Sequence, residues 1–576
     1  MSPIQQMFLG LGAGGDGGYW FVTYTAASNS GNGYNNAYRP ERFALDSSGN
    51  IYLAGRCKDY ATFGNDFDED GGHVIQIKKD GTLGWLRLIG TIAQNFAYDV
   101  TLDSAKNVYV AGKLAQNTSG LTEPGYISKY NSSGAHQNLK STNNHRLQAI
   151  AATSASFPTG YSTTSYYANG SNISGPGGTG EYRIYYNPSI SNPWRLNFGT
   201  ATSEATTSKA LQDYLTSNYS GEYIIGPARD ASGSVRFFEI LKVTSSSTGE
   251  CLVTGGAYQG GYPPSICLQT IANSVQWAKK LDYTPYSSGM SDWDARITDI
   301  KIDSNHNIYV LSKAKRDTNR RRSIISKWHP SGNMLWARII GNPNTNNKEV
   351  TLNSLDFDSN NDVICVGVET YDYGSKCFVI KYNQAGEQQW QRRIKTGTNH
   401  VRDAQGVAID TSDSNKIFIV GYGNTIAGGG GNRWWIYQTN ADCTSILNQK
   451  TFNTTNPSGA DERCYHIKIK DDAMYMSGYK YGQLQTNTNI MTGFVVKVPK
   501  DFSLTGTYGY VTYGNATGNS QIVTNPNIQQ APIVRHTPTS DWEEFTSLGN
   551  ITVTVASNST GSITNSNPNF DTEVVE

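Results

Sequence analysis

The sequence predicts an all-β protein built as a single β-propeller, from a repeated hairpin phrase, a second hairpin phrase that follows it and a recurring tryptophan. The first phrase reads "ALDSSGNIYLAG" at residues 44–55 and "TLDSAKNVYVAG" at residues 101–112. Strand-forming residues flank a cluster of Asp, Ser, Asn and Gly, which bend the backbone through local hydrogen bonds or positive φ angles. Each copy therefore predicts a strand, a tight turn and a second strand.

The second phrase reads "VIQIKKDGTLGWLRLIG" from Val74 and "IISKWHPSGNMLWARIIG" from Ile324. It is again strand, turn and strand, so a complete unit contains four strands. Repeated four-stranded units are typical of propeller blades. Tryptophans mark this phrase and its looser copies, at Trp85, Trp194, Trp277, Trp336 and Trp390. We expect these tryptophans on the fourth strand of each unit, packed between blades.

The repeat count favours eight blades, with seven as the alternative. The third unit is a degenerate copy, because its first phrase is recognisable only around "LQAIAATSASFPTGY" from Leu147. Residues 200–236 fit no unit and predict an insertion on one rim. We predict a flexible N-terminal arm at residues 1–18, the propeller at residues 19–514, and a polar C-terminal linker or anchoring tail at residues 515–576.

Closure of the ring needs an extra strand, because an open sheet edge invites aggregation. The segment "YWFVTY", residues 19–24, resembles the fourth strand of a unit and has no hairpin partner before it. We expect it to complete the last blade. The alternative closing strand is "YGYVTYG", residues 508–514.

Charge and composition bear on several classes of function. The chain has 47 basic and 47 acidic side chains, so no long-range attraction to nucleic acid or to an anionic membrane is expected. No apolar run is long enough for a membrane-spanning helix. The first residues, "MSPIQQMFLGLGAGG", lack the positive charge of a secretory signal peptide.

The cysteines are scattered and show no C-x-x-C spacing. A zinc site or a disulfide framework is therefore not expected. We predict buried free thiols, with a pair between Cys365 and Cys377 as the alternative. This usage is typical of a protein made in a reducing cytoplasm.

One acidic segment has part of the spacing of a calcium-binding loop. In "DFDEDG", residues 66–71, Asp66, Asp68 and Asp70 stand on alternate residues and can converge on a hard cation. An EF-hand loop also needs Glu at its last position, where this chain has Ile77. We predict a solvated acidic loop, with calcium binding as the alternative, and no other cofactor.

Two further segments carry polar motifs. The basic cluster "KAKRDTNRRR", residues 313–322, is expected in a rim loop, either simply solvated or binding phosphate or acidic polysaccharide. The segment "GLGAGG", residues 10–15, matches G-x-G-x-x-G. It lacks the preceding strand and following helix of a dinucleotide site, so we interpret it as part of the N-terminal arm.

A repeated aspartate invites a catalytic interpretation but has a structural one. A catalytic group is rarely needed five times, whereas Asp at the start of a turn accepts hydrogen bonds from the amides that follow. No catalytic triad or metal-binding histidine motif is present in the spacing, so we assign no catalytic, cofactor-binding or metal-ligating residue. The repeated residues are Asp46, Asp103, Asp303, Asp358 and Asp410.

The two-hairpin unit, "FALDSSGNIYLAG" followed by "VIQIKKDGTLGWLRLIG", resembles bacterial β-propeller repeats of the SBBP type. The start, "MSPIQQMFLGLGAGG", and the Ser/Thr/Asn-rich end are similar to those of structural proteins of marine tailed phages, notably those that infect cyanobacteria. The first resemblance implies a propeller. The second implies a virion component, such as a tail fibre, tail-tip or baseplate-associated protein.

We therefore hypothesise a non-enzymatic phage virion protein, made in the host cytoplasm. It would join other virion proteins through its ends, as a homo-oligomer around the tail axis, and contact host surface glycan through its loops. The alternative is a propeller glycosidase or lyase that degrades polysaccharide, which would need paired carboxylates near the ring axis. A third hypothesis is a bacterial surface adhesin. Neither nucleic acid nor a membrane span is expected.

Overall fold

The computed structural model describes residues 18–25, 36–59, 71–89, 95–114, 125–141, 169–175, 178–186, 194–198, 201–205, 242–245, 251–256, 265–270, 275–280, 296–315, 321–340, 348–371, 374–396, 403–424, 432–454, 462–481, 491–508, 511–515, 520–524, 530–532, 549–550, 555–557 and 569–575. Within these ranges every helix or strand element is a β-strand. The described residues contain no helix with the length and apolar character needed to cross a membrane.

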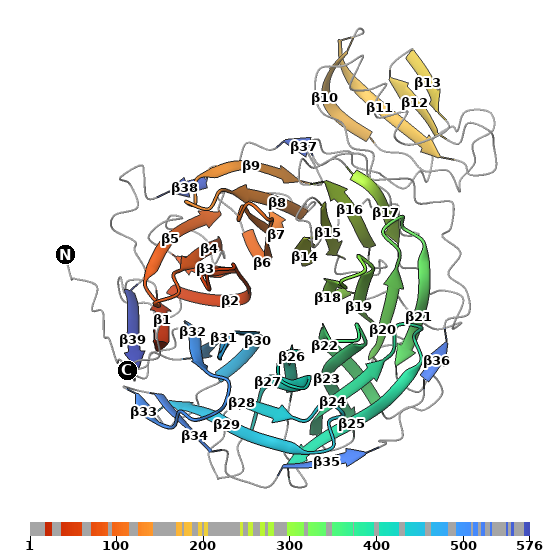
Figure 1. Ribbon diagram of the computed structural model, residues 1–576. Helices are drawn as coiled ribbons and strands as arrows, with labels where there is room; N and C mark the ends of the chain where they lie inside the picture. The colour runs from red at the N-terminus through yellow and green to blue at the C-terminus, as the bar shows by residue number, and fades with distance from the viewer. Residues whose placement is uncertain are drawn as a thin grey trace.

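Seven sheets of the described residues contact one another in a closed circle (Figure 1). Six of them are blades of four consecutive, antiparallel strands. The first two blades are β2 (Asn36–Leu45), β3 (Ile51–Asp59), β4 (Gly71–Ile77) and β5 (Leu83–Ile89), then β6 (Asn95–Leu102), β7 (Val108–Leu114), β8 (Gly125–Tyr130) and β9 (His136–Ser141).

The remaining four blades follow in chain order around the ring. The third is β14 (Lys242–Ser245), β15 (Cys251–Gly256), β16 (Ser265–Thr270) and β17 (Val275–Lys280), and the fourth is β18 (Arg296–Ile302), β19 (Ile308–Lys315), β20 (Arg321–Trp328) and β21 (Met334–Ile340). The fifth is β22 (Lys348–Phe357), β23 (Val363–Tyr371), β24 (Gly374–Tyr382) and β25 (Gln388–Thr396), and the sixth is β26 (Asp403–Asp410), β27 (Lys416–Asn424), β28 (Asn432–Thr439) and β29 (Ile446–Thr454).

The seventh sheet closes the ring, and it combines an N-terminal strand with strands from the C-terminal half of the chain. Its strands are β30 (Glu462–Lys470), β31 (Ala473–Tyr481), β32 (Met491–Pro499) and β1 (Tyr19–Thr25). β1 pairs antiparallel with β32, with Trp20 opposite Lys497. The prediction that the N-terminal strand completes the last blade is confirmed. The alternative, residues 508–514, falls in β33 (Gly506–Tyr508) and β34 (Val511–Asn515), and β34 extends the sixth blade through β29.

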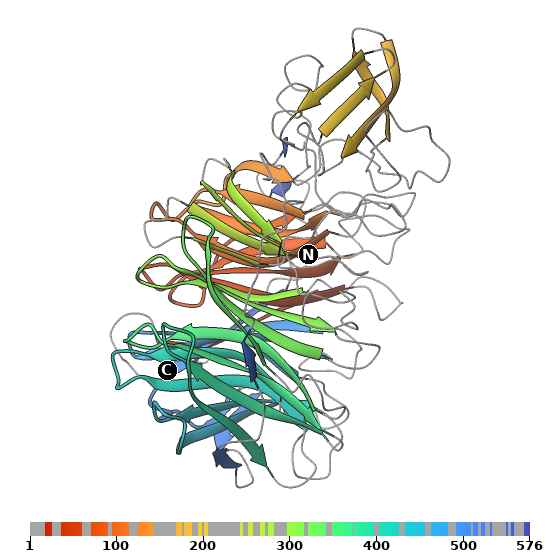
Figure 2. The same ribbon diagram turned by 90° about the vertical axis from the view of Figure 1, so that its right-hand side faces the viewer.

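The favoured count of eight blades is wrong, because one four-stranded sheet lies outside the ring (Figures 1 and 2). This satellite sheet consists of β10 (Asn169–Gly175), β11 (Gly178–Tyr186), β12 (Trp194–Phe198) and β13 (Ala201–Ala205). It contains most of the degenerate third unit, and it stands in a longer insertion between β9 and β14 than the predicted residues 200–236. The degenerate third unit lacks the Asp turn of the first phrase. Its sequence pattern predicts strands, but it does not show whether those strands belong to the ring.

The polar C-terminal segment, predicted as a linker or anchoring tail, supplies outer strands to the ring (Figure 1). We call these six strands the outer belt. They run backwards around the ring and each pairs antiparallel with the outermost strand of a sheet: β34 on β29, β35 (Ser520–Thr524) on β25, β36 (Gln530–Pro532) on β21, β37 (Gly549–Asn550) on β9, β38 (Val555–Ser557) on β5 and β39 (Asn569–Val575) on β1. Residues 533–548, between β36 and β37, lie outside the described residues.

The repeated aspartates form the turns between first and second strands, as predicted. The Asp46 carboxylate accepts hydrogen bonds from the backbone N–H groups of Ser48 (2.8 Å) and Asn50 (2.9 Å). All five aspartates are buried. Because strands alternate in direction, these turns and those between third and fourth strands lie on one side of the ring, the turn face. The inner strands begin on the opposite side, which we call the entry face.

Trp336 packs across a blade boundary, as predicted, whereas the same prediction is wrong for Trp194, which lies in β12 of the satellite sheet. The Trp336 indole N–H donates to the carbonyl oxygen of Gln384 in the next blade at 2.9 Å. Its ring lies 6.1 Å from that of Tyr382, also in the next blade. Gly386 has a φ of +79°, and a Cβ there would meet the Trp336 ring. Trp85 repeats the arrangement, donating to a carbonyl oxygen of the second blade.

Replacing Trp336 with Ala should lower the free energy of unfolding by about 3–5 kcal/mol, because a large buried ring is lost between two blades. Leu335→Ala is the control, since Leu335 is 50% exposed and should change stability by less than about 0.5 kcal/mol. Urea denaturation of the full chain measures both. A loss below about 1 kcal/mol for Trp336→Ala would contradict the interblade packing.

Deleting residues 1–24 should open the ring and cause aggregation, because β1 lies between β32 and β39 and both would lose their partner. Deleting only residues 1–17 keeps β1 and should leave folding unchanged. Light scattering and thermal melts of the two truncated chains measure the difference. A soluble, cooperatively folding chain without residues 1–24 would show that another strand can close the ring.

Candidate functional site

The inner strand carries a β-bulge in six of the seven ring sheets, in β2, β6, β18, β22, β26 and β30, whereas the described part of β14 pairs with β15 without a register shift. The extra residue brings the inner strand close to the second strand. A Cβ on Gly55 would collide with the carbonyl oxygen of Arg39, and one on Gly112 would collide with that of Phe96. The bulge therefore explains the glycine that ends the repeated phrase, and that glycine was the sequence signal for it.

Charged side chains follow the bulges and gather at the ring axis. We call the six residues Arg42, Asp99, Asp299, Lys301, Asp356 and Lys468 the axial cluster. Arg42 Nη1 donates to Asp299 Oδ1 at 2.9 Å, which links the first blade to the fourth. Lys301 Nζ lies 2.7 Å from Asp356 Oδ1, which links the fourth blade to the fifth. Sequence analysis did not single out these residues.

The axial carboxylates also hold the free inner edges of neighbouring blades. Their oxygens accept hydrogen bonds from backbone N–H groups of the next inner strand. The three bonds are Val243 N–H to Asp99 Oδ2 (3.1 Å), Leu355 N–H to Asp299 Oδ2 (2.9 Å) and Ile409 N–H to Asp356 Oδ2 (2.9 Å). Each carboxylate thus stabilises the edge of an adjacent blade.

This arrangement bears on the enzyme alternative, which needs two carboxylates that flank a substrate. The described axial carboxylates are each bonded to backbone amides or paired with cations. Within the described residues, no group of three or more His, Cys, Asp or Glu side chains is arranged to hold a metal ion. Residues 66–70 of the acidic loop lie outside the described residues, so the calcium hypothesis is untested.

Lys468 stands among the axial charges. Burial is the main cause that lowers its pKa to about 8, although the side chain keeps some contact with solvent. The positive charges of Lys301 and Arg42 also lower this pKa, while Asp99 and Asp356 oppose the shift. Lys468 therefore holds its proton less tightly in the folded ring than in the unfolded chain.

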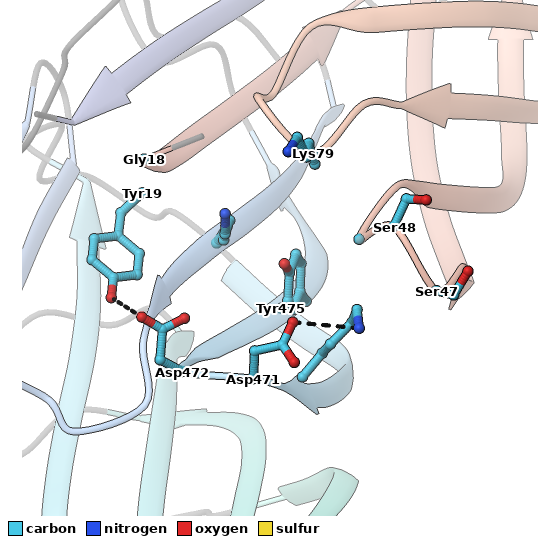
Figure 3. Close-up of a pocket in the computed structure, with 11 residues that line it drawn as sticks. Gly18, Tyr19, Ser47, Ser48, Lys79, Asp471, Asp472 and Tyr475 are labelled. Atoms are coloured by element: carbon cyan, nitrogen blue, oxygen red, sulfur yellow. Dashed lines mark hydrogen bonds and ion pairs between the residues drawn. The ribbon is translucent and has the colours of Figure 1, made fainter. Parts of the chain in front are cut away.

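A cavity of about 680 Å³ opens where the first blade meets the closing blade (Figure 3). We call it the seam pocket. Its walls come from two turns, from the β4–β5 connection and from the start of β1. The residues that define its chemistry are Tyr19, Ser48, Lys79, Asp471, Asp472 and Tyr475.

The closing strand shapes the seam pocket and is fastened beside it. Figure 3 shows Tyr19 pointing to Asp472, and the phenol O–H donates to Oδ2 at 3.3 Å. The Trp20 indole N–H donates to the carbonyl oxygen of Lys79 at 3.0 Å, which ties β1 to the first blade. Burial, aided by the nearby aspartates, raises the pKa of Tyr475 to about 12. Protonated phenols, lysines and carboxylates together suit a polar ligand with several hydroxyl groups.

The structure changes the interpretation of the basic cluster at residues 313–322. Lys313 lies in β19, and Arg322 lies in β20 with only 2% of its surface exposed. The prediction of a solvated rim loop is therefore wrong for Arg322. Residues 316–320 and the glycine-rich residues 10–15 lie outside the described residues.

The four cysteines whose side chains are described are buried and form no disulfide, as predicted. Cys365 lies opposite Ile380 and Cys377 lies opposite Val368, so these two cysteines do not form the alternative disulfide. Burial raises the pKa of the Cys443 thiol to about 12. The described free cysteines are Cys365, Cys377, Cys443 and Cys464.

No family model matches the sequence, and no curated protein matches it. Among solved structures, a protein of unknown function from Dyadobacter fermentans is similar, with a TM-score of 0.38, 10% identity, and coverage of 83% of this chain and 99% of that one. The polysaccharide lyase Uly1 gives a TM-score of 0.30 and 11% identity, covering 70% of this chain and 90% of the lyase. These similarities carry no argument about function.

Replacing Lys468 with Met should flatten the dependence of stability on pH. The folded-state pKa of about 8 lies below the ordinary lysine value of 10.5, so the unfolded chain binds more protons between these values. Stability linked to Lys468 should therefore rise with pH from about 8 towards 10, by about 1–3 kcal/mol. The difference in unfolding free energy between wild type and Lys468→Met measures it. A difference that does not change with pH would contradict the shift.

Proposed function

We propose that the chain is a phage virion structural protein, a tail fibre or a tail- or baseplate-associated component, which forms a rigid propeller for assembly and for attachment to host surface glycan. The observation that carries the proposal is that strands from both the N-terminal and the C-terminal segments of the chain close the ring. β1 completes the last blade, and the outer belt covers the outermost strands of six sheets.

Double closure supports a structural role, because unpaired strand edges are templates for aggregation. A ring with covered edges can be packed beside many copies of itself without edge-to-edge pairing. The carboxylates of the axial cluster cover the inner edges of the blades in the same way, because they accept hydrogen bonds from backbone N–H groups there. The likeness of the sequence at both ends to structural proteins of marine tailed phages supports the same proposal.

Other virion proteins would be bound through the ends of the chain. The satellite sheet stands outside the ring (Figure 2) and is a suitable element for contact with other virion proteins. The seam pocket offers hydroxyl-compatible chemistry for a glycan. Several copies around the tail axis would suit a rotationally symmetric particle. The protein would be made in the host cytoplasm and located in the virion.

Mass spectrometry of purified phage particles should detect the chain at a stoichiometry comparable to other tail proteins. Purified protein incubated with host envelope polysaccharide should bind it without releasing shortened sugars. Absence of the chain from particles would overturn the virion role. Steady production of new reducing ends or unsaturated sugars would overturn the non-enzymatic role and favour the polysaccharide-degrading alternative.

A further inference from the structure

Three arginines at the entry face lie over aromatic rings of neighbouring blades. They belong to the closing blade and to the first blade, and the rings belong to the sixth, closing and second blades. We call these six residues the arginine–aromatic arc. The pairs, with the distance from guanidinium carbon to ring centre, are Arg463 over Tyr422 (4.7 Å), Arg39 over Tyr465 (5.1 Å) and Arg56 over Phe96 (4.5 Å).

The arc is continuous across four adjacent sheets. The rings of Tyr422 and Tyr465 lie 6.5 Å apart, and those of Tyr465 and Tyr479 lie 5.6 Å apart. Arg39 Nη2 donates to the Tyr465 hydroxyl at 3.2 Å. These residues stand where inner strands begin and second strands end, on the face opposite the aspartate turns. Cations and aromatic faces therefore alternate around this side of the axis.

The arc carries more positive than negative charge. One oxygen of Glu41 lies 3.2 Å from Arg39 Nε and 2.9 Å from Arg56 Nε, so two guanidinium groups share a single carboxylate oxygen. Lys113 adds a fourth cation, 4.8 Å from the centre of the Phe96 ring. About 30% of the Arg39 side chain and 29% of the Arg56 side chain remain exposed. The Nε atoms that face Glu41 are buried, so a ligand from solvent would meet the exposed remainder of each side chain.

A second carboxyl group, that of Asp403, lies near the end of the arc. Burial raises the pKa of Asp403, although Tyr422 and Ser375 donate hydrogen bonds to it and Arg463 lies nearby. The named groups therefore comprise four cations against Glu41 and Asp403. This local excess contrasts with the balanced charge of the whole chain.

We propose that the arginine–aromatic arc binds an acidic polysaccharide through the carboxylates of its uronate residues; this inference rests on the proposed glycan attachment and names its site and ligand class. The planar guanidinium fork matches a carboxylate through two parallel hydrogen bonds. Tyr422 and Tyr465 are partly exposed, and a tyrosine ring has an apolar face and a polar tip, which suit the C–H faces and hydroxyls of a sugar. A polymer fits better than a single sugar, because the cations recur across adjacent blades.

A purely structural arginine–aromatic contact looks different in this protein. The guanidinium carbon of Arg338 lies 5.6 Å from the ring centre of Trp336, and both residues are on the same outer strand. Arg338 Nη1 donates to the carbonyl oxygen of the neighbouring Ala337. That contact stays within one strand. The arc arginines instead reach rings of neighbouring blades, and Arg39 and Arg56 share Glu41. Replacing Arg338 therefore provides a matched control, because the variant loses an arginine–aromatic contact that does not belong to the arc.

The test measures binding of the full chain to polygalacturonate oligomers and to the same oligomers with methyl-esterified carboxyls, by calorimetry. The wild type should bind the charged form at least tenfold more tightly than the ester. The double variant Arg39→Gln/Arg56→Gln should lose tenfold or more in affinity for the charged form. Arg338→Gln and the seam-pocket variant Lys79→Gln should bind like the wild type. Thermal melts check folding, and the single variant Arg56→Lys, which keeps the charge without the fork, should be intermediate.

Equal binding of ester and charged oligomers, unchanged affinity of a folded double variant, or a loss confined to Lys79→Gln would each overturn the inference. Tighter binding of dextran sulfate at matched charge density would overturn the assignment to carboxylates. Binding of host envelope polysaccharide, measured in parallel, separates this inference from the proposed function. Envelope binding without polyuronate binding removes the arc site alone, whereas absence of both removes the proposed attachment as well.

Discussion

The unpaired edge of a β-sheet is the constraint on which this structure depends. Every four-stranded blade has an inner edge at the axis and an outer edge at the rim, and both expose backbone groups that need partners. Asp99, Asp299 and Asp356 bond inner-edge amides of the next blade. The outer belt pairs with six outermost strands, and β1 fills the gap in the last blade. Charged residues at the axis and the polar C-terminal segment thus solve the same problem.

The repeated phrase encodes local structure well, because its signals are local. Asp46 and Asn50 specify a turn through hydrogen bonds within five residues, and Trp336 specifies a fourth strand that packs on the next hairpin. The likeness of residues 19–24 to a fourth strand was enough to predict closure. Blade number was not predictable in the same way. The satellite sheet has strand-forming sequence like a blade, and its position outside the ring depends on tertiary contacts that no local pattern reports.

The axial cluster, the seam pocket and the outer belt were invisible to sequence reasoning for a related physical reason. Arg42 and Asp299 pair across 257 positions of sequence, and Arg39 meets Tyr465 across 426. An isolated charged residue on a strand gives no sign of such a partner. The belt strands are as short as two residues and rich in polar side chains, so they resemble a linker until a sheet edge lies beside them. The glycine that ends the repeated phrase, opposite the bulge, was the one sequence signal for the shape of the inner strands.

Closure also determines where a ligand can bind. The seam pocket needs Tyr19 from β1 and Asp472 from the closing blade, and the arginine–aromatic arc needs Arg39 from the first blade beside Tyr465 from the last. Neither arrangement exists in an open chain of blades. Ligand binding at either position would therefore favour the closed ring, since a ligand that binds only the folded state stabilises it.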